Sequence, residues 1–193
     1  MRTNTAKIKQ STDIHVYQMK ITLEDSKPPI WRRIQVPSTV TLYRFHQILQ
    51  VVMGWSNYHL HEFNIDGLHY GEPSPDNEYK VRNEKTVKLS QVISKEGAKF
   101  AYIYDFGDDW YHKILVEKIL QPESDKHYPI CIKGTRACPP EDCGGIGGYY
   151  DFLEIIKNPD DPDHGQMLEW VGGSYDPEAF GLDNINQQLR KIK

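Results

Sequence analysis

The segment YDFGDDWYH, residues 104–112, places three carboxylates and one imidazole within eight residues, namely Asp105, Asp108, Asp109 and His112. Several carboxylates near an imidazole can hold a divalent cation or act as general acid and base. The alternative interpretation is a tight turn whose aspartates bond their own backbone and against which Trp110 packs. The sequence leaves both interpretations open.

Strands that flank this segment position its side chains. AKFAYIYDF and WYHKILVEKIL predict a β-hairpin with the loop Gly107-Asp108-Asp109. That loop length would pair Phe106 with Trp110 and Tyr104 with His112, so His112 is expected among aromatic side chains.

A second segment, CPPEDCGGIGGYYDF at residues 138–152, predicts a rigid connector that leads into a helix at 146–157. Two prolines fix φ angles and lower the entropy of the unfolded loop. Glu141 and Asp142 are expected to accept N–H groups at the helix start, and Tyr149 to carry the helix onto the sheet.

We expect the connector and the hairpin tip to form two walls of one acidic cleft. The candidate binding residues are then Asp105, Asp108, Asp109, Trp110, His112, Glu141, Asp142 and Tyr149. No motif assigns a catalytic residue, and no cofactor is expected. Structural zinc on Cys131, Cys138 and Cys143, with His127, is the alternative, although their spacings lack the tight CxxC knuckle.

Three further histidines lie on the segment YHLHEFNIDGLHYG, which Asp66-Gly67 predicts to be a second hairpin. His59, His61 and His69 could together suit zinc. Alternating polar positions on a half-exposed strand explain them without a metal, and we favour this interpretation.

The other elements follow from periodicity and turn residues. Two strands open the chain, with Tyr17, Met19, Ile21 and Leu23 on one face of the first. A helix follows, capped by Thr39 or Thr41 and ended by Gly54. Its apolar residues at helical spacing are expected to be buried, namely Leu42, Phe45, Leu49 and Val52. Residues 123–145 are expected to be mostly loop, before three short helices of which the last, DNINQQLRKIK, is capped by Asp183.

This order predicts an α+β fold: a mostly antiparallel sheet with one helix packed on it and a helical C-terminal lobe. We expect a disordered tail (1–13), a single domain (14–185) and a terminal helix end (186–193).

Charge is unevenly distributed along the 193 residues. Residues 1–60 carry eight Lys/Arg and three Asp/Glu, whereas residues 141–193 carry four and eleven. A uniformly basic nucleic-acid binder does not have this pattern. The polar start and the lack of a long apolar run predict a cytoplasmic protein with no membrane contact.

The chain resembles the plasmid open-reading-frame-three-like family over about residues 14–185. The matching stretches are YQMKITLEDSKPPIWRRIQVP, TLYRFHQILQ to MGW, HLHEF, YDFGDDWYHKI and YPICIKGTRACPPEDCGGIGGYYDFL. This family carries no established activity. Its other label, a TnpR-type passenger of an insertion element, implies a connection with recombination. However, the seven arginines form no recombinase constellation, and no basic helix-turn-helix is visible.

The sequence therefore favours a plasmid- or mobile-element-associated protein that acts as a non-catalytic binding or adaptor domain. Its partner is expected to be a protein, with nucleic acid as a possibility. The aromatics Trp31, Trp55, Trp110 and Tyr149 are expected to be exposed for this purpose. Two alternatives are a metal-assisted hydrolase or nuclease that uses the acidic hairpin, and a DNA-binding accessory protein that uses Arg32, Arg33 and Arg44.

Overall fold

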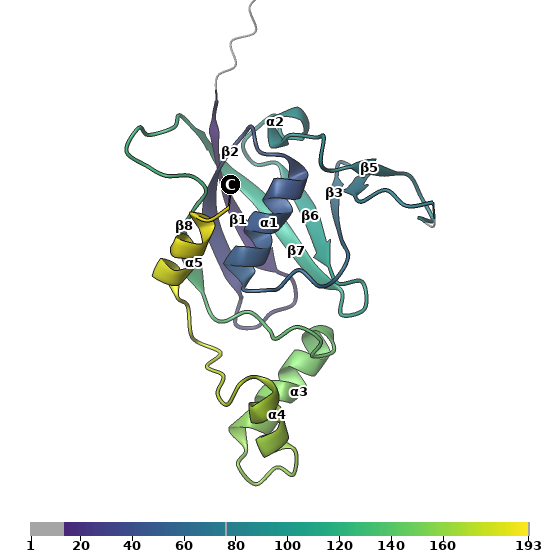
Figure 1. Cartoon of the computed structure of the whole chain (residues 1–193), viewed down its shortest axis with the longest axis vertical. Coiled ribbons are helices and arrows are strands. Elements are labelled where there is room, and N and C mark those ends of the chain that lie inside the picture. The colour runs from purple at the N-terminus through teal and green to yellow at the C-terminus, as the bar shows by residue number, and fades with distance from the viewer. Residues whose placement is uncertain (1–13, 76, 193) are drawn as a thin grey trace, which may run out of the picture.

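One sheet of eight strands forms the body of the protein (Figure 1). The computed structural model describes residues 14–75 and 77–192, so the predicted disordered tail at 1–13 lies outside the described residues. The strand order is β5-β4-β3-β6-β7-β1-β2-β8. All neighbouring strands are antiparallel except β4 and β5. The strands are β1 (Val16–Leu23), β2 (Trp31–Pro37), β3 (His61–Ile65), β4 (Leu68–Gly71), β5 (Val81–Asn83), β6 (Lys99–Tyr104), β7 (Trp110–Leu120) and β8 (Ile130–Thr135).

Helix α1 (Leu42–Met53) crosses one face of this sheet (Figure 1). Thr41 caps it by accepting the backbone N–H of Arg44 at 3.2 Å. Gly54 ends it with φ 93°, a left-handed conformation that glycine adopts without steric cost. Both ends agree with the helix predicted from the sequence.

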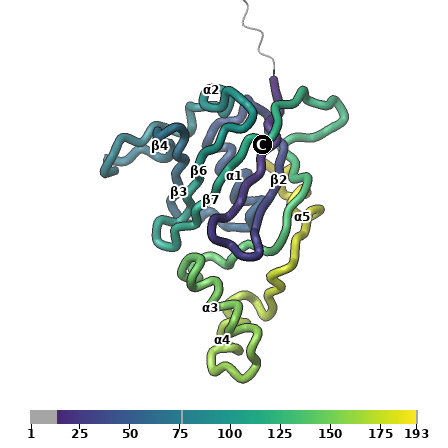
Figure 2. Tube along the Cα trace, turned by 180° about the vertical axis from the view of Figure 1, so that it is seen from behind, coloured from purple at the N-terminus to yellow at the C-terminus, as the bar shows by residue number. Residues whose placement is uncertain are grey.

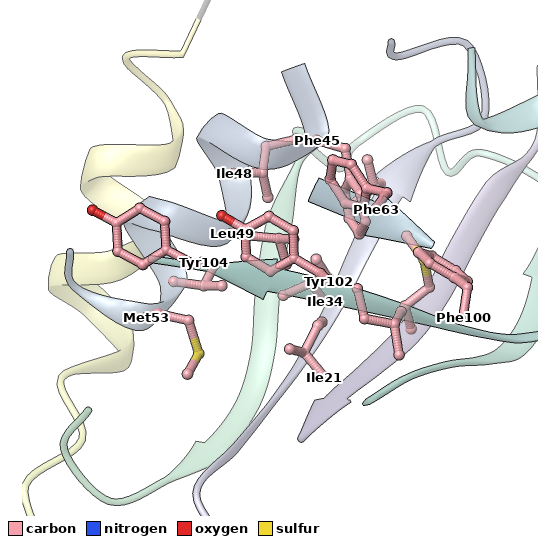
Figure 3. Packing of buried hydrophobic residues seen from close by; sticks show 14 of the residues in the cluster. Ile21, Ile34, Phe45, Ile48, Leu49, Met53, Phe63, Phe100, Tyr102 and Tyr104 are labelled. Carbon is pink, nitrogen blue, oxygen red and sulfur yellow. The ribbon is translucent and has the colours of Figure 1, made fainter. Parts of the chain in front are cut away.

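The core lies between α1 and the sheet (Figure 3). Phe45 stacks on Phe63 of β3 with ring centroids 5.7 Å apart, and Leu49 is fully buried. Every residue predicted for the core from periodicity is buried: Tyr17, Ile21, Leu23, Leu42, Phe45, Leu49 and Val52. The predicted fold class, α+β with a mostly antiparallel sheet and a helix packed on it, is confirmed.

Residues 123–145 are mostly loop, as predicted, but β8 was not expected within that range, where it pairs with β2. Its outer edge is covered by a side chain instead of another strand. The Asn186 amide accepts the backbone N–H of Cys131 at 2.8 Å and donates to its carbonyl at 2.9 Å. Asn186 belongs to α5 (Leu182–Leu189), which begins after Gly181, so the expected cap Asp183 lies in the first turn instead.

Helices α3 (Gly145–Lys157) and α4 (His164–Trp170) form a lobe that projects from one end of the sheet (Figures 1 and 2). The predicted helix at 146–157 agrees with α3 to within one residue. A single turn, α2 (Leu89–Val92), completes the helices within the described ranges. Chain segments at both ends of this lobe lead back to the body.

Candidate functional site

The hairpin tip and the connector meet in the structure. The Tyr104 hydroxyl donates to Glu141 at 2.5 Å, and the backbone N–H of Gly144 donates to Asp108 at 3.3 Å. The segment after α1 joins them, since Trp55 Nε1 donates to the Pro139 carbonyl at 3.0 Å and the Ser56 N–H donates to Glu141 at 2.9 Å. We call this meeting of three segments the loop junction (residues 55–59, 104–109 and 138–145).

Hairpin β6–β7 has a longer loop than expected. Tyr104 pairs with Trp110 and Tyr102 with His112, so the predicted pairing of Phe106 with Trp110 is wrong. The loop has five residues because Asp105 and Asp109 both adopt positive φ, 58° and 53°, and the N–H of Asp109 returns to the Asp105 carbonyl at 2.7 Å. Aspartate tolerates this left-handed conformation better than most residues.

Asp105 is the acidic residue of the tip that the fold buries, with 8% of its surface exposed. Its Oδ1 accepts the N–H of Gly107 at 2.9 Å, as in an Asx turn. Its Oδ2 lies 3.6 Å from Nδ1 of His59, whose Nε2 lies 3.1 Å from Oδ1 of Asp142. His59, Asp105 and Asp142 thus bring three potential metal ligands within 4.8 Å of one another.

Besides Asp105, three of the candidate binding residues are buried, and the expectation that these three line a cleft is wrong. Trp110 and Tyr149 are each 1% exposed, and His112 is fully buried. His112 packs edge-on against Trp55, with ring centroids 5.3 Å apart, and burial lowers its pKa to about 4. Because Trp55 is 7% exposed as well, the expected surface aromatics are largely core residues. Strand alternation places Trp110 and His112 on the face that α1 covers.

Glu141 and Asp142 do not cap α3, contrary to expectation. The N-cap is Gly144, with φ 87°. Glu141 instead accepts two hydrogen bonds from the body, and burial together with this carboxylate raises the pKa of its donor Tyr104. Asp142 turns toward His59 and remains 68% exposed at its side chain.

The three cysteines do not form a metal centre in the described part of the chain. No set of three donors there that includes Cys131, Cys138 or Cys143 lies within ligand distance. All three are free thiols, and burial raises the pKa of Cys131 to about 11 and that of Cys143 to about 12. The thiolate that binds zinc is therefore disfavoured at each position.

The three hairpin histidines face four different carboxylates, two of them at His59. Besides the contacts of His59, His61 Nε2 lies 2.9 Å from Glu84, and His69 Nδ1 lies 2.6 Å from Glu62. His61 also stacks on His46 of α1, and these side chains help to line a polar pocket of about 670 Å³. His46 and Glu84 were not predicted from the sequence as residues of this pocket. The only local signal was a histidine on the apolar face of α1.

The lobe, taken as residues 141–178, is the most strongly charged part of the chain. It contains ten Asp/Glu and a single Lys. Between its helices lies a groove of about 430 Å³, which we call the lobe groove. Its lining residues are Asp142, Cys143, Gly148, Asp151, Phe152, Ile155, Gln166, Met167 and Trp170. Trp170 is 45% exposed there, in contrast to Trp55 and Trp110 of the body, which are buried.

The arginines proposed for DNA binding are engaged within the protein. Arg32 is 2% exposed and donates to the carbonyls of Val52 and Thr135, both at 2.7 Å. Arg33 forms a two-pronged ion pair with Glu117 at 2.6 and 2.7 Å. Arg32 therefore cannot contribute to DNA binding, because a buried guanidinium cannot reach a phosphate group.

This fold defines an α+β protein with one mostly antiparallel sheet, a packed helix and a helical lobe. The chain belongs to the plasmid pRiA4b ORF-3-like protein family, whose model matches residues 15–184. It is 38% identical over 176 residues to the uncharacterized protein y4hQ of Sinorhizobium fredii, covering 90% of each chain. The crystal structure of MM3350 from Methanosarcina mazei Go1, titled a protein of unknown function, matches with a TM-score of 0.82. That match has 38% identity and covers 90% of this chain and 97% of the other.

These relatives establish the family and the fold without assigning an activity. Within the described residues, no helix has the length and apolar character that crossing a membrane requires.

Proposed function

We propose that this chain is a protein-binding adaptor domain whose lobe groove docks a basic, amphipathic segment of a partner protein. The observation that carries the proposal is an apolar groove set in an acidic lobe. Phe152, Ile155, Met167 and Trp170 supply the apolar surface, while Asp142 and Asp151 lie in the same lining.

Charge favours a partner segment rich in Lys and Arg. Most acidic side chains of the lobe are exposed: Asp142, Asp151, Glu154, Asp160, Asp163, Glu169, Asp176 and Glu178. Three of them have partners, since Asp142 faces His59, Glu178 pairs with Arg136 and Glu154 approaches Lys157 at 4.0 Å. A field of one sign accelerates association with an oppositely charged segment and repels nucleic acid.

Trp170 is the residue expected to contribute most to docking. It packs edge-on against Phe152, with ring centroids 5.8 Å apart, and this contact holds the indole at the groove. Large aromatic side chains at the centre of an interface commonly dominate binding energy. Position and exposure both favour Trp170 as an anchor.

Fluorescence anisotropy with a labelled helical peptide of alternating Leu and Lys faces tests the proposal on the full chain. We expect saturable binding that weakens as salt rises, and at least a tenfold increase in Kd for Trp170→Ala. Gln166 is an exposed residue of the groove. Gln166→Arg adds a positive charge there, so it is expected to weaken binding of the basic peptide without removing packing contacts. Tyr58→Ala, which removes a body aromatic that is 81% exposed, is the matched control and should leave Kd unchanged.

Equal affinity of all four proteins for the peptide would contradict the proposal, since it would reflect attraction to net charge alone. Equal binding of a peptide in which Glu replaces every Lys would contradict it as well. Circular dichroism of each variant separates lost docking from lost folding.

A further inference from the structure

Three side chains from distant parts of the sequence converge at the loop junction. His59 precedes β3, Asp105 begins the tip between β6 and β7, and Asp142 lies in the connector before α3. His59 Nδ1 lies 3.6 Å from Asp105 Oδ2, and His59 Nε2 lies 3.1 Å from Asp142 Oδ1. This convergence shares Asp142 with the lining of the lobe groove, but it does not depend on the proposed partner.

Ordinary hydrogen bonding does not account for this arrangement. His59 Nε2 is a buried atom that has no hydrogen-bond partner among the described residues, although a carboxylate oxygen lies close to it. The separation from Asp105 also exceeds hydrogen-bond length. A buried polar atom without a partner is costly, which favours a bound group at this point.

The backbone holds both aspartates in place without a ligand. Asp105 and Asp142 have φ angles of 58° and 61°, in the left-handed region. The Asx-turn hydrogen bond to Gly107 occupies Oδ1 of Asp105, and Oδ2 is left directed at His59. Hydrogen bonds from Tyr104 and Ser56 anchor Glu141, the residue before Asp142.

We infer that His59, Asp105 and Asp142 bind one divalent transition-metal ion of the Zn²⁺ class. One imidazole nitrogen with two carboxylate oxygens is a donor set that zinc and manganese accept, whereas calcium and magnesium prefer oxygen alone. Ligand atoms around tetrahedral zinc lie roughly 3.3 Å from one another, given bonds of about 2.0–2.1 Å. One ligand atom from each of the three residues lies within 4.8 Å of the other two, so side-chain rotation has to bring the three atoms to that spacing around an ion that a single imidazole nitrogen binds.

The ion would act as a clip between the sheet and the lobe. It joins the start of β3, the β6–β7 tip and the connector, so it restrains α3 at its N-terminal end. Three protein ligands also leave a coordination position for water or for a group of a bound molecule. His59 lines the polar pocket and Asp142 lines the lobe groove, so this position lies between the two.

Isothermal titration of the tag-free full chain with zinc chloride, and separately with manganese and magnesium chloride, tests the inference. We expect one zinc site per chain, a zinc-dependent rise in Tm, and slower amide exchange across residues 138–150. Magnesium is expected to bind at least tenfold more weakly than zinc.

Variants that preserve the backbone assign the ligands. Asp105→Asn and Asp142→Asn retain a residue type that tolerates positive φ, and His59→Gln removes the imidazole. Each should weaken zinc binding at least tenfold. Asp109→Asn is the matched control, because Asp109 is exposed on the same tip at φ 53° and lies outside the trio.

Two outcomes would overturn the inference. Absence of zinc and manganese binding by the folded chain would leave the three side chains as polar contacts across the loop junction and nothing more. Zinc binding that survives all three variants and disappears when Cys138 and Cys143 are replaced by Ser would move the site to the cysteines.

Discussion

The imidazole of His46 lies flat on that of His61, with ring centroids 3.4 Å apart and planes 2° from parallel. Tyr102 and Asn57 hold the two nitrogens of His46, each at 2.7 Å. Glu84 lies 2.9 Å from His61. Two stacked imidazoles cannot both carry a charge without strong repulsion, and burial lowers the pKa of His46, which favours its neutral form.

The pH dependence of stability should reflect this stack. Burial, followed by the charge of His61, lowers the pKa of His46 from 6.5 to about 3, and burial lowers that of His112 to about 4. The unfolded chain takes up these protons first, so their contribution to stability is complete above about pH 6.5 and is lost as pH falls toward 4. We expect each histidine to steepen the loss by up to about 1.4 kcal/mol per pH unit.

Urea unfolding of the protein and of His46→Gln and His112→Gln, measured from pH 7.5 to 4, checks this expectation. Each variant should show a flatter dependence of unfolding free energy on pH than the parent. Parallel pH profiles would mean that neither histidine is neutral in the folded state. His15→Gln serves as the control, because His15 lies outside the His46–His61 stack and is not a neighbour of His112.

Core packing beneath α1 gives a second prediction. Leu49 is fully buried, and Leu49→Ala should lower the free energy of unfolding by about 2–5 kcal/mol. Gln47→Ala, on the outer side of the same helix, should change it by less than about 0.5 kcal/mol. Chemical denaturation of both variants measures these changes in the free energy of unfolding. A loss below half a kcal/mol for Leu49→Ala would place α1 outside the core.

Local signals explain why most of the fold could be predicted. Asp66-Gly67 adopts positive φ at both residues, 51° and 74°, which the predicted hairpin turn requires. Thr41 and Gly54 bound α1 as expected. β8 could not be predicted in this way, because its outer edge is paired by an asparagine 55 residues further along the chain.

The candidate site was only partly predictable for the same reason. Asp105 and Asp142 were identified from carboxylate density, and the meeting of their loops was expected. His59 was considered only with the other hairpin histidines, although it faces both aspartates. The strand partners of Trp110 and His112 were also not predicted, because the expected loop was two residues shorter than the observed one.

Arg32 gives a third prediction, because its charge is buried under carbonyl groups instead of facing a partner. Besides Val52 and Thr135, it donates to the Trp31 carbonyl at 3.0 Å and lies over the Phe180 ring at 4.9 Å. Arg32→Met leaves these buried acceptors without a donor and should cost about 3 kcal/mol or more. Arg44→Met, near the surface of α1, should cost less than about 0.5 kcal/mol. Equal stability of the two variants would contradict a structural role for Arg32.

The glycines of the connector give the last prediction. At Gly148 a side chain would overlap the carbonyl oxygen of Cys143, whereas at Gly147, one residue earlier in α3, a Cβ meets nothing within 4 Å. Gly147→Ala should therefore stabilise the protein by about 0.5–1 kcal/mol through helix propensity. Gly148→Ala has the same intrinsic gain but must displace the turn that carries Asp142 and Cys143, so we expect a net loss of about 1–3 kcal/mol. Thermal unfolding of the two variants, with zinc titration of each, measures both effects. If Gly148→Ala proves as stable as Gly147→Ala, the close approach of the connector to α3 does not hold the loop junction together.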